Sequence, residues 1–228
     1  MSFQNEERLA EEIIEAVKQL GLPLKLDRLT EAKGNCFPLA ILDQCHRKEI
    51  FENLQSSVKQ VIELNDPTYL RKQIYSFISQ SADSRIKEWR RSYDNIVLPL
   101  ENTTWQEYWT KMIRNYEWVD STFIQATAWY LQHDIRIIST TSTKLNPFIV
   151  VSGNLMNENV PSNQYDILLG SKPNVHFQSL LPMTEDSLMT DDTALNFSYE
   201  YNGENLNFTF TGSKIVKCAK CKKEFKNI

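Results

Sequence analysis

The stretch Gly34-Asn35-Cys36-Phe37 sets a glycine and an amide side chain directly before a cysteine, and an apolar run to Leu42 follows it. The run predicts a buried helix that begins at about Cys36. A thiol at a helix N-terminus feels the positive end of the helix dipole, which favours the thiolate. Glycine lets the preceding backbone turn its N–H groups toward an oxyanion. We therefore interpret Cys36 as a candidate nucleophile.

A candidate base, His176, lies far downstream in the chain. Histidine exchanges protons near neutral pH and can activate a thiol when the two side chains meet in the fold. The other two histidines have no such context, because His46 lies in a polar helix end and His133 at a helix-to-strand turn. The first hypothesis is a cysteine hydrolase with Cys36 as nucleophile and His176 as base.

Bulk composition narrows the class of protein. A chain of 228 residues with 41% hydrophobic content suits one good-sized domain with a small appendage. The net charge of -4 does not suggest nucleic acid as a partner, and four cysteines are too few for a disulfide scaffold. We see no secretory signal and no run of transmembrane length. We expect an intracellular, cytoplasmic protein with no membrane partner.

Apolar residues at helical spacing predict a series of helices in the first part of the chain. The aromatic residues of these helices, and Cys45, are expected in the core rather than in a ligand site. The predicted helices cover Glu6–Leu20, a segment from Cys36, Glu49–Leu64, a segment after Asp66-Pro67, Thr104–Trp118, and a segment capped by Asp120 or Ser121. The aromatic residues are Trp105, Tyr108, Trp109, Trp118 and Trp129.

Short strands follow the helices. The pattern predicts strands at Ile135–Ile138, Pro147–Val151, Tyr165–Leu169 and His176–Leu181. Helices first and short strands later indicate a mixed α/β (α+β) fold, in which a small central β-sheet lies between helical subdomains.

The composition changes after Pro182, where a polar, acidic linker precedes two alternating segments, Leu195–Tyr201 and Asn205–Phe210. Asn202-Gly203 between them predicts a C-terminal β-hairpin appendage. We expect a main domain over 1–182, a linker and hairpin over 183–212, and a basic tail over 213–228.

The tail contains Cys218 and Cys221 in a Cys-x-x-Cys spacing that forms half of a zinc site, but zinc needs four ligands. The pair is open to three interpretations: the first half of a finger in a longer protein, a metal shared between two molecules, or a free tail. We assign no complete metal site.

Three segments resemble the ovarian-tumour (OTU) family of cysteine proteases in the same order, over about residues 25 to 182. The first is Lys33-Gly34-Asn35-Cys36-Phe37. The second is Trp118-Val119-Asp120-Ser121, followed by a predicted helix and strand. The third is His176-Phe177-Gln178. Members of this family act as deubiquitinases. The resemblance implies the fold of the family, a small sheet covered by helices.

The resemblance implies a role for each matching residue. Cys36 would attack the carbonyl carbon at the ubiquitin C-terminus, and His176 would take the thiol proton. The backbone around Lys33, Gly34, Asn35 and Cys36 would hold the oxyanion. The implied partners are ubiquitin, polyubiquitin chains or ubiquitinated proteins. The resemblance implies that the chemistry needs no cofactor and that the protein is a monomer. The protein would act in the cytoplasm of its own cell, or in the host cytoplasm if it is a pathogen effector.

Two positions depart from the family pattern. Lys33 stands where the family has an aspartate that shapes the oxyanion loop, and Gln178 stands where asparagine or aspartate orients the histidine. An amide oxygen can still orient an imidazole, and otherwise Asp27 or Glu31 would supply a carboxylate. The departures leave two alternatives open: a non-catalytic ubiquitin-binding module on the same fold, and a cysteine protease for another modifier or a polyprotein.

Overall fold

The computed structural model describes residues 3–31, 33–92, 103–154, 166–183, 197–201, 206–210, 216–217 and 224–225. The chain divides into two compact units, Met1–Leu181 and Pro182–Ile228. No helix within the described ranges is both long and apolar enough to cross a membrane.

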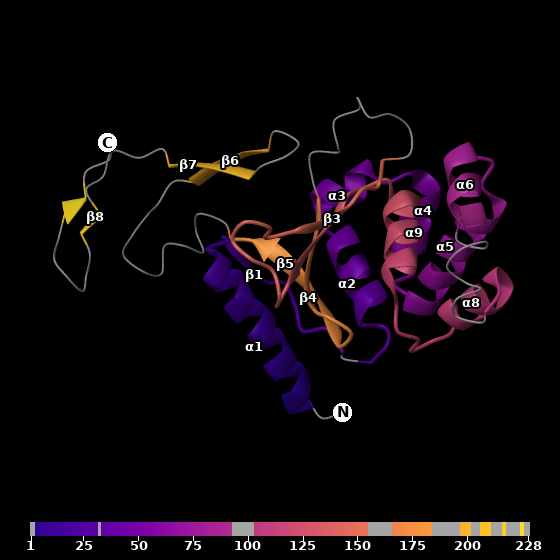
Figure 1. The fold of residues 1–228 in the computed structure, drawn as a ribbon, viewed down its shortest axis with the longest axis horizontal. Coiled ribbons are helices and arrows are strands. Elements are labelled where there is room, and N and C mark those ends of the chain that lie inside the picture. The colour runs from indigo at the N-terminus through magenta and orange to yellow at the C-terminus, as the bar shows by residue number, and fades with distance from the viewer. Residues whose placement is uncertain are drawn as a thin grey trace. The chain divides into compact units, whose positions relative to one another are not determined.

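Helices and one sheet make up the first unit (Figure 1). The helices are α1 (Phe3–Leu20), α2 (Cys36–Cys45), α3 (Lys48–Asn53), α4 (Ser56–Glu63), α5 (Pro67–Gln80), α6 (Ser84–Ser92), α8 (Trp105–Met112) and α9 (Ser121–Leu131). The strands are β1 (Leu24–Leu26), β2 (Ile135–Ser139), β3 (Ile149–Val151), β4 (Ile167–Lys172) and β5 (His176–Pro182).

The sheet is mixed and has the order β1-β5-β4-β2-β3. Strand β2 runs parallel to β4, with Ile135 opposite Ile167, and antiparallel to β3. Strand β5 returns antiparallel to β4 and sets His176 opposite Lys172. At the β1 side, the Asp27 N–H donates to the Ser179 carbonyl at 3.0 Å.

The sheet lies between α1 on one face and the remaining helices on the other (Figure 1). Alternate residues of a strand point to opposite faces, and this alternation separates two apolar clusters. The larger cluster includes Ile135, Ile137, Ile167 and Leu169 with residues of α2 to α9. The smaller cluster includes Ile138 and Leu180 with Ile13 and Val17 of α1. The expected α/β class with a central sheet between helices is confirmed.

One buried glutamine fixes α2 against the sheet. Gln44, near the end of α2, donates to the Ser179 hydroxyl and the Leu180 carbonyl, both at 2.7 Å. Its side-chain oxygen accepts from the Leu168 N–H at 2.9 Å. Because these partners lie on β4 and β5, the helix that begins at Cys36 is held in register with the strand that carries His176.

Two predicted helices differ from the structure. The single helix expected over Glu49–Leu64 is wrong, because the chain is extended at Leu54 and Gln55 and α3 and α4 are separate. Leu54 is buried at this corner, so the apolar spacing continues across the break. The helix expected to reach Trp118 ends at Met112. Helix α6 was not predicted.

The helix termini at the site follow the sequence signals. Asp66 caps α5 through the N–H groups of Thr68 and Tyr69, with proline in the first turn. Asp120 caps α9 by accepting from the Phe123 N–H at 2.9 Å.

The second unit contains β6 (Phe197–Tyr201) and β7 (Leu206–Phe210), which pair antiparallel as the predicted hairpin requires. The turn residues Asn202-Gly203 lie outside the described residues. Strands β8 (Val216–Lys217) and β9 (Glu224–Phe225) form a second short pair. Cys218 and Cys221 also lie outside the described residues.

Candidate active site

Cys36 is the first residue of α2 and is 1% exposed. The backbone N–H groups of Phe177 and Phe37 lie close enough to its sulfur to favour the thiolate, as does the N–H of Cys36 itself. The Phe177 group comes from β5, so the thiol lies against the backbone that immediately follows His176. The first turn of a helix has N–H groups with no partner inside the helix, which suits an anion at this position.

An aromatic pair packs the two halves of the site together. Phe37, which follows the cysteine, meets Phe177, which follows the histidine, edge to face with ring centroids 5.2 Å apart. Phe37 also contacts Phe123 of α9 at 6.2 Å. These contacts position the start of α2 against β5.

His176 and Gln178 are both fully buried on β5 and contact each other. Gln178 Nε2 lies 2.5 Å from His176 Nε2. Gln178 Oε1 accepts from the Thr30 N–H at 3.0 Å, and Gln178 Nε2 lies 3.5 Å from the Thr30 carbonyl oxygen. The Thr30 backbone therefore determines which end of the amide faces the imidazole.

This arrangement differs from the expected one, in which an amide oxygen orients the histidine. An amide nitrogen can only donate, so His176 Nε2 must accept and the neutral ring carries its proton on Nδ1. His176 Nδ1 is buried and has no hydrogen-bond partner among the described residues. In this tautomer Nδ1 has no free lone pair with which to take a proton.

The loop before Cys36 is pressed against the segment at Tyr116. A Cβ on Gly34 would lie 1.8 Å from the Tyr116 carbonyl oxygen, so only glycine fits. The Asn35 side chain accepts from the Tyr116 N–H at 3.0 Å and donates to Asn115. The Asn35 amide side chain is thus occupied in holding the loop.

The backbone of the loop is also partly engaged. The Asn35 N–H donates to the Lys33 carbonyl. The side chain of Lys33 forms an exposed ion pair with Glu31. Neither Lys33 nor Glu31 brings a charged group to the thiol or the imidazole, so Glu31 does not supply the missing carboxylate.

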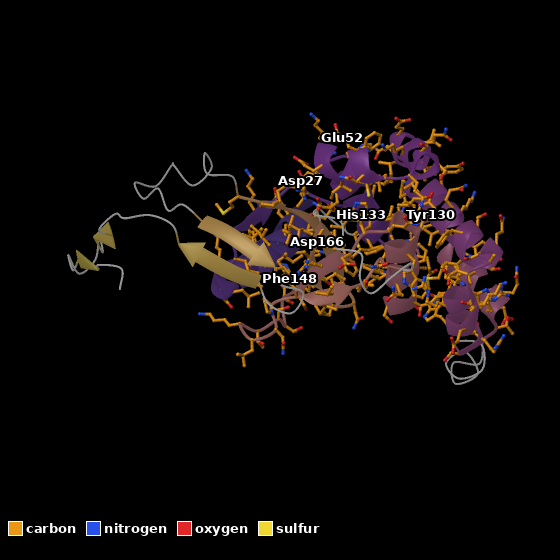
Figure 2. All side chains as sticks on the ribbon, turned by 90° about the horizontal axis from the view of Figure 1, so that it is seen from above. Asp27, Glu52, Tyr130, His133, Phe148 and Asp166 are labelled. Carbon is orange, nitrogen blue, oxygen red and sulfur yellow. The ribbon has the colours of Figure 1, made fainter. Side chains whose placement is uncertain are left out.

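Asp27, the other candidate carboxylate, accepts a hydrogen bond from the Ser179 hydroxyl at 2.9 Å (Figure 2). Ser179 also receives the Gln44 side chain, so Asp27 belongs to the contacts that join α2 to the sheet. In the part of the chain that the structure describes, the group that contacts His176 is Gln178.

Burial makes both candidate catalytic groups neutral. It raises the pKa of the Cys36 thiol to about 11, although the three backbone N–H groups and Arg71 act in the opposite direction. Burial lowers the pKa of His176 to about 4. Near neutral pH the site therefore holds a thiol and an imidazole rather than an ion pair.

Sequence reasoning missed Arg71, a fully buried cation beside Cys36. It lies on α5 three residues before Ile74 and seven before Ile78, both on the buried face of that helix. A charged residue on an apolar helix face was the signal that could have revealed it.

The remaining candidates have structural positions. Cys45 is fully buried in the core, and His46 is exposed at the end of α2. His133, labelled in Figure 2, is buried between α9 and β2 with Nδ1 2.9 Å from the Leu131 carbonyl oxygen. The aromatic group expected in the core is buried or half-buried except for Trp118, which is 39% exposed.

By sequence, the chain matches no protein-family description and no characterised protein. By structure, it is similar to the h/ceOTUB1 chain in a complex with ubiquitin aldehyde and UBC13~Ub. That match has a TM-score of 0.51 and 10% identity, and covers 75% of this chain and 82% of that chain. The match to the h/ceOTUB1 chain with ubiquitin aldehyde and UBCH5B~Ub has a TM-score of 0.50 and 12% identity. It covers 78% of this chain and 84% of that chain.

The chain has the OTU fold. A further similar structure is the OTUD1 OTU domain, with a TM-score of 0.48 and 15% identity, over 77% of this chain and 98% of that chain. At these identities the likeness concerns the fold.

Proposed function

We propose that this chain is a cysteine-type deubiquitinase that hydrolyses isopeptide bonds at the ubiquitin C-terminus. The observation that carries the proposal is the position of Cys36, at the N-terminus of α2 with its sulfur against the backbone next to His176. The OTU fold supports the same function, since the OTUB1 chains that share it are held with ubiquitin aldehyde.

The proposed chemistry uses two groups in two steps. The Cys36 sulfur bonds to the carbonyl carbon while its proton passes to His176, and the protonated imidazole then gives this proton to the departing lysine amine. Cleavage of the C–N bond leaves a thioester. Water, deprotonated by His176, attacks the thioester, which releases the ubiquitin carboxylate and restores the thiol.

For His176 to accept the thiol proton, its own proton must reside on Nε2. The Gln178 amide then has to turn by about half a rotation, so that Oε1 faces the ring. That turn gives up the hydrogen bond from the Thr30 N–H, which is worth roughly 0.5–1.5 kcal/mol. We propose that this rotation accompanies activation of the site.

The deciding experiment is labelling with ubiquitin that carries a thiol-reactive group at its C-terminus. We expect an adduct on the wild-type chain and none on Cys36→Ala. Cys45→Ala is the matched control, because it removes a buried thiol from the same helix without touching the site. An adduct that persists in Cys36→Ala would contradict the proposal.

A second candidate is a non-catalytic ubiquitin-binding module, which is favoured by the amide nitrogen that faces His176. In that case wild type and Cys36→Ala would bind ubiquitin equally in a titration, and neither would form an adduct. Binding without an adduct, in a protein whose circular dichroism shows it folded, would select this candidate.

A further inference from the structure

Arg71 is a buried cation with an unusual set of partners. Its guanidinium donates to the backbone carbonyls of Gly34 and Met112, both at 2.8 Å, and to the carbonyl of Glu117. It also lies over the Phe123 ring, 5.3 Å from the centroid. Among the described residues it forms no ion pair with a carboxylate, and its Nε has no partner.

Burial without a carboxylate in hydrogen-bond contact is costly, because the charge loses hydration and its hydrogen bonds go to neutral carbonyls. Burial accordingly lowers the pKa of Arg71 to about 10, still well above neutral pH, so the side chain stays charged. The contact with the Gly34 carbonyl sets this charge beside the loop that leads into Cys36, where the thiolate would form.

The first of the three carbonyls belongs to the loop before the nucleophile. A peptide group is planar and trans, so its C=O and N–H point in opposite directions. Arg71 holds the Gly34 carbonyl, while the Asn35 N–H of the same peptide donates to Lys33. The peptide between Gly34 and Asn35 is therefore fixed at both ends, and with it the backbone that leads into Cys36.

The guanidinium also acts on the thiol through its charge. Arg71 favours the Cys36 thiolate, and Cys36 in turn is the first of the groups that favour the charged form of Arg71. Glu117 and Tyr108 also favour the charged form of Arg71. Near neutral pH His176 is uncharged, so Arg71 is the cation next to the reacting sulfur.

We propose that Arg71 is a positioning residue of the active site, which pins the loop before Cys36 through the Gly34 carbonyl and supplies the fixed positive charge that stabilises the thiolate. This role rests on the proposed function, in which Cys36 is the nucleophile. It replaces the charge that an imidazolium would supply in a site with a preformed ion pair.

The test is the rate at which iodoacetamide alkylates Cys36 between pH 7 and 9, with the modified peptide identified by mass spectrometry. At these pH values the rate follows the thiolate fraction. Arg71→Met should lower the rate about tenfold at every pH, the effect of one pKa unit. Arg71→Lys keeps the charge, so its alkylation rate should stay within about threefold of the wild-type rate.

Arg136→Met is the matched control. Arg136 is also buried, pairs with Asp166 and lies over the Phe148 ring, both labelled in Figure 2. Its loss should destabilise the fold in a similar way but leave Cys36 alkylation within about threefold. A rate in Arg71→Met that equals or exceeds the wild-type rate would overturn the proposal. If Arg71→Met does not fold, a tenfold drop in the Cys36 alkylation rate of Arg71→Lys would also overturn the proposal.

The ubiquitin probe tests the pinning of the loop. Lysine cannot bridge three carbonyls as the guanidinium fork does, so Arg71→Lys should label at least tenfold more slowly than wild type, and equal labelling would refute the positioning role. Because iodoacetamide needs no ubiquitin, the alkylation result stands even if the wild-type chain forms no adduct. In that case the proposed function fails, but the alkylation rates still show whether the charge of Arg71 stabilises the Cys36 thiolate.

Discussion

Gln178 controls which ring nitrogen of the candidate base carries the proton. In a catalytic triad, an oxygen accepts the proton of one imidazole nitrogen and leaves the other nitrogen free as a base. Gln178 faces His176 Nε2, so Nδ1 would be the base in this chain. Here the Thr30 N–H holds the Gln178 oxygen, and the nitrogen faces the ring. The extra methylene of glutamine lets the amide reach the Thr30 backbone, which a shorter asparagine would not do in the same way.

Gln178→Glu should therefore activate the site. Glutamate has the same length, and its two oxygens can accept from both the Thr30 N–H and His176 Nε2. We expect labelling by the ubiquitin probe to rise about tenfold or more over wild type, within the range that general-base catalysis supplies. Gln178→Met, which keeps the length without polar atoms, is the control. Slower labelling in Gln178→Glu than in wild type would show that the amide orientation does not limit the reaction.

The buried imidazole should also make stability depend on pH. The pKa of His176 falls from 6.5 to about 4 through burial. Between these values the unfolded chain binds a proton that the folded chain does not, so the folded state loses stability as pH falls. The loss should approach about 3 kcal/mol over the window, since one pKa unit corresponds to about 1.4 kcal/mol. Urea unfolding from pH 7 to 4.5 measures it.

His176→Gln isolates this contribution, because the other titrating groups remain. Asp43 and Asp166, whose pKa values are raised by burial, act with the opposite sign and cancel in the comparison. The variant should lose less stability than wild type over the same range. If the free energies of unfolding of the two proteins fall in parallel with pH, His176 is solvated in solution.

At the scale of the element, the loop before α2 depends on a glycine. Gly34→Ala would bring a Cβ to within 1.8 Å of the Tyr116 carbonyl oxygen, so the loop would have to move away from Tyr116. We expect labelling by the ubiquitin probe to fall by about a hundredfold, because a misplacement of about 1 Å costs that much when reacting groups must align.

Gly21→Ala is the comparison for the same substitution elsewhere. Gly21 ends α1 with a φ of +72°, but nothing lies within 4 Å of its added Cβ. Its replacement should cost about 1 kcal/mol of stability from backbone strain and leave labelling near the wild-type rate. Equal labelling of Gly34→Ala and wild type would show that the loop tolerates displacement.

Elements with strong local signals could be predicted from the sequence. The start of α2 at Cys36, the caps Asp66 and Asp120 and the strand at His176 all depend on nearby residues. The break between α3 and α4 could not be predicted, because Leu54 keeps the apolar spacing through the corner. The early end of α8 is a tertiary effect, since the chain after it packs on the loop before Cys36.

The candidate site was predictable in its residue types but not in its contacts. Cys36 and His176 stand out by motif, and the fold brings their backbones together. Which end of the Gln178 amide faces the ring depends on Thr30, more than a hundred residues away in sequence. Arg71 acts through backbone carbonyls, which have no side-chain signature.

At the scale of the whole molecule, the candidate site belongs to the first unit, because the sheet that carries His176 and the helix that begins at Cys36 both lie there. Cys36, His176, Gln178 and Arg71 all lie within Met1–Leu181, and Gln44 joins α2 to the strands of the same unit. Among the described residues, the contacts that orient the thiol and the imidazole come from this unit. They agree with the catalytic domain that we propose over 1–182.

A chain ending at Met183 tests this division. It keeps all of β5, and with it the strand that carries His176 and Gln178. We expect it to melt within a few degrees of the main transition of the full chain, because its own core is intact. Labelling by the ubiquitin probe should stay within about threefold of the full-length rate. A drop of tenfold or more with an unchanged melting temperature would place part of the ubiquitin-binding surface in residues 184–228, and the appendage would then belong to the functional unit.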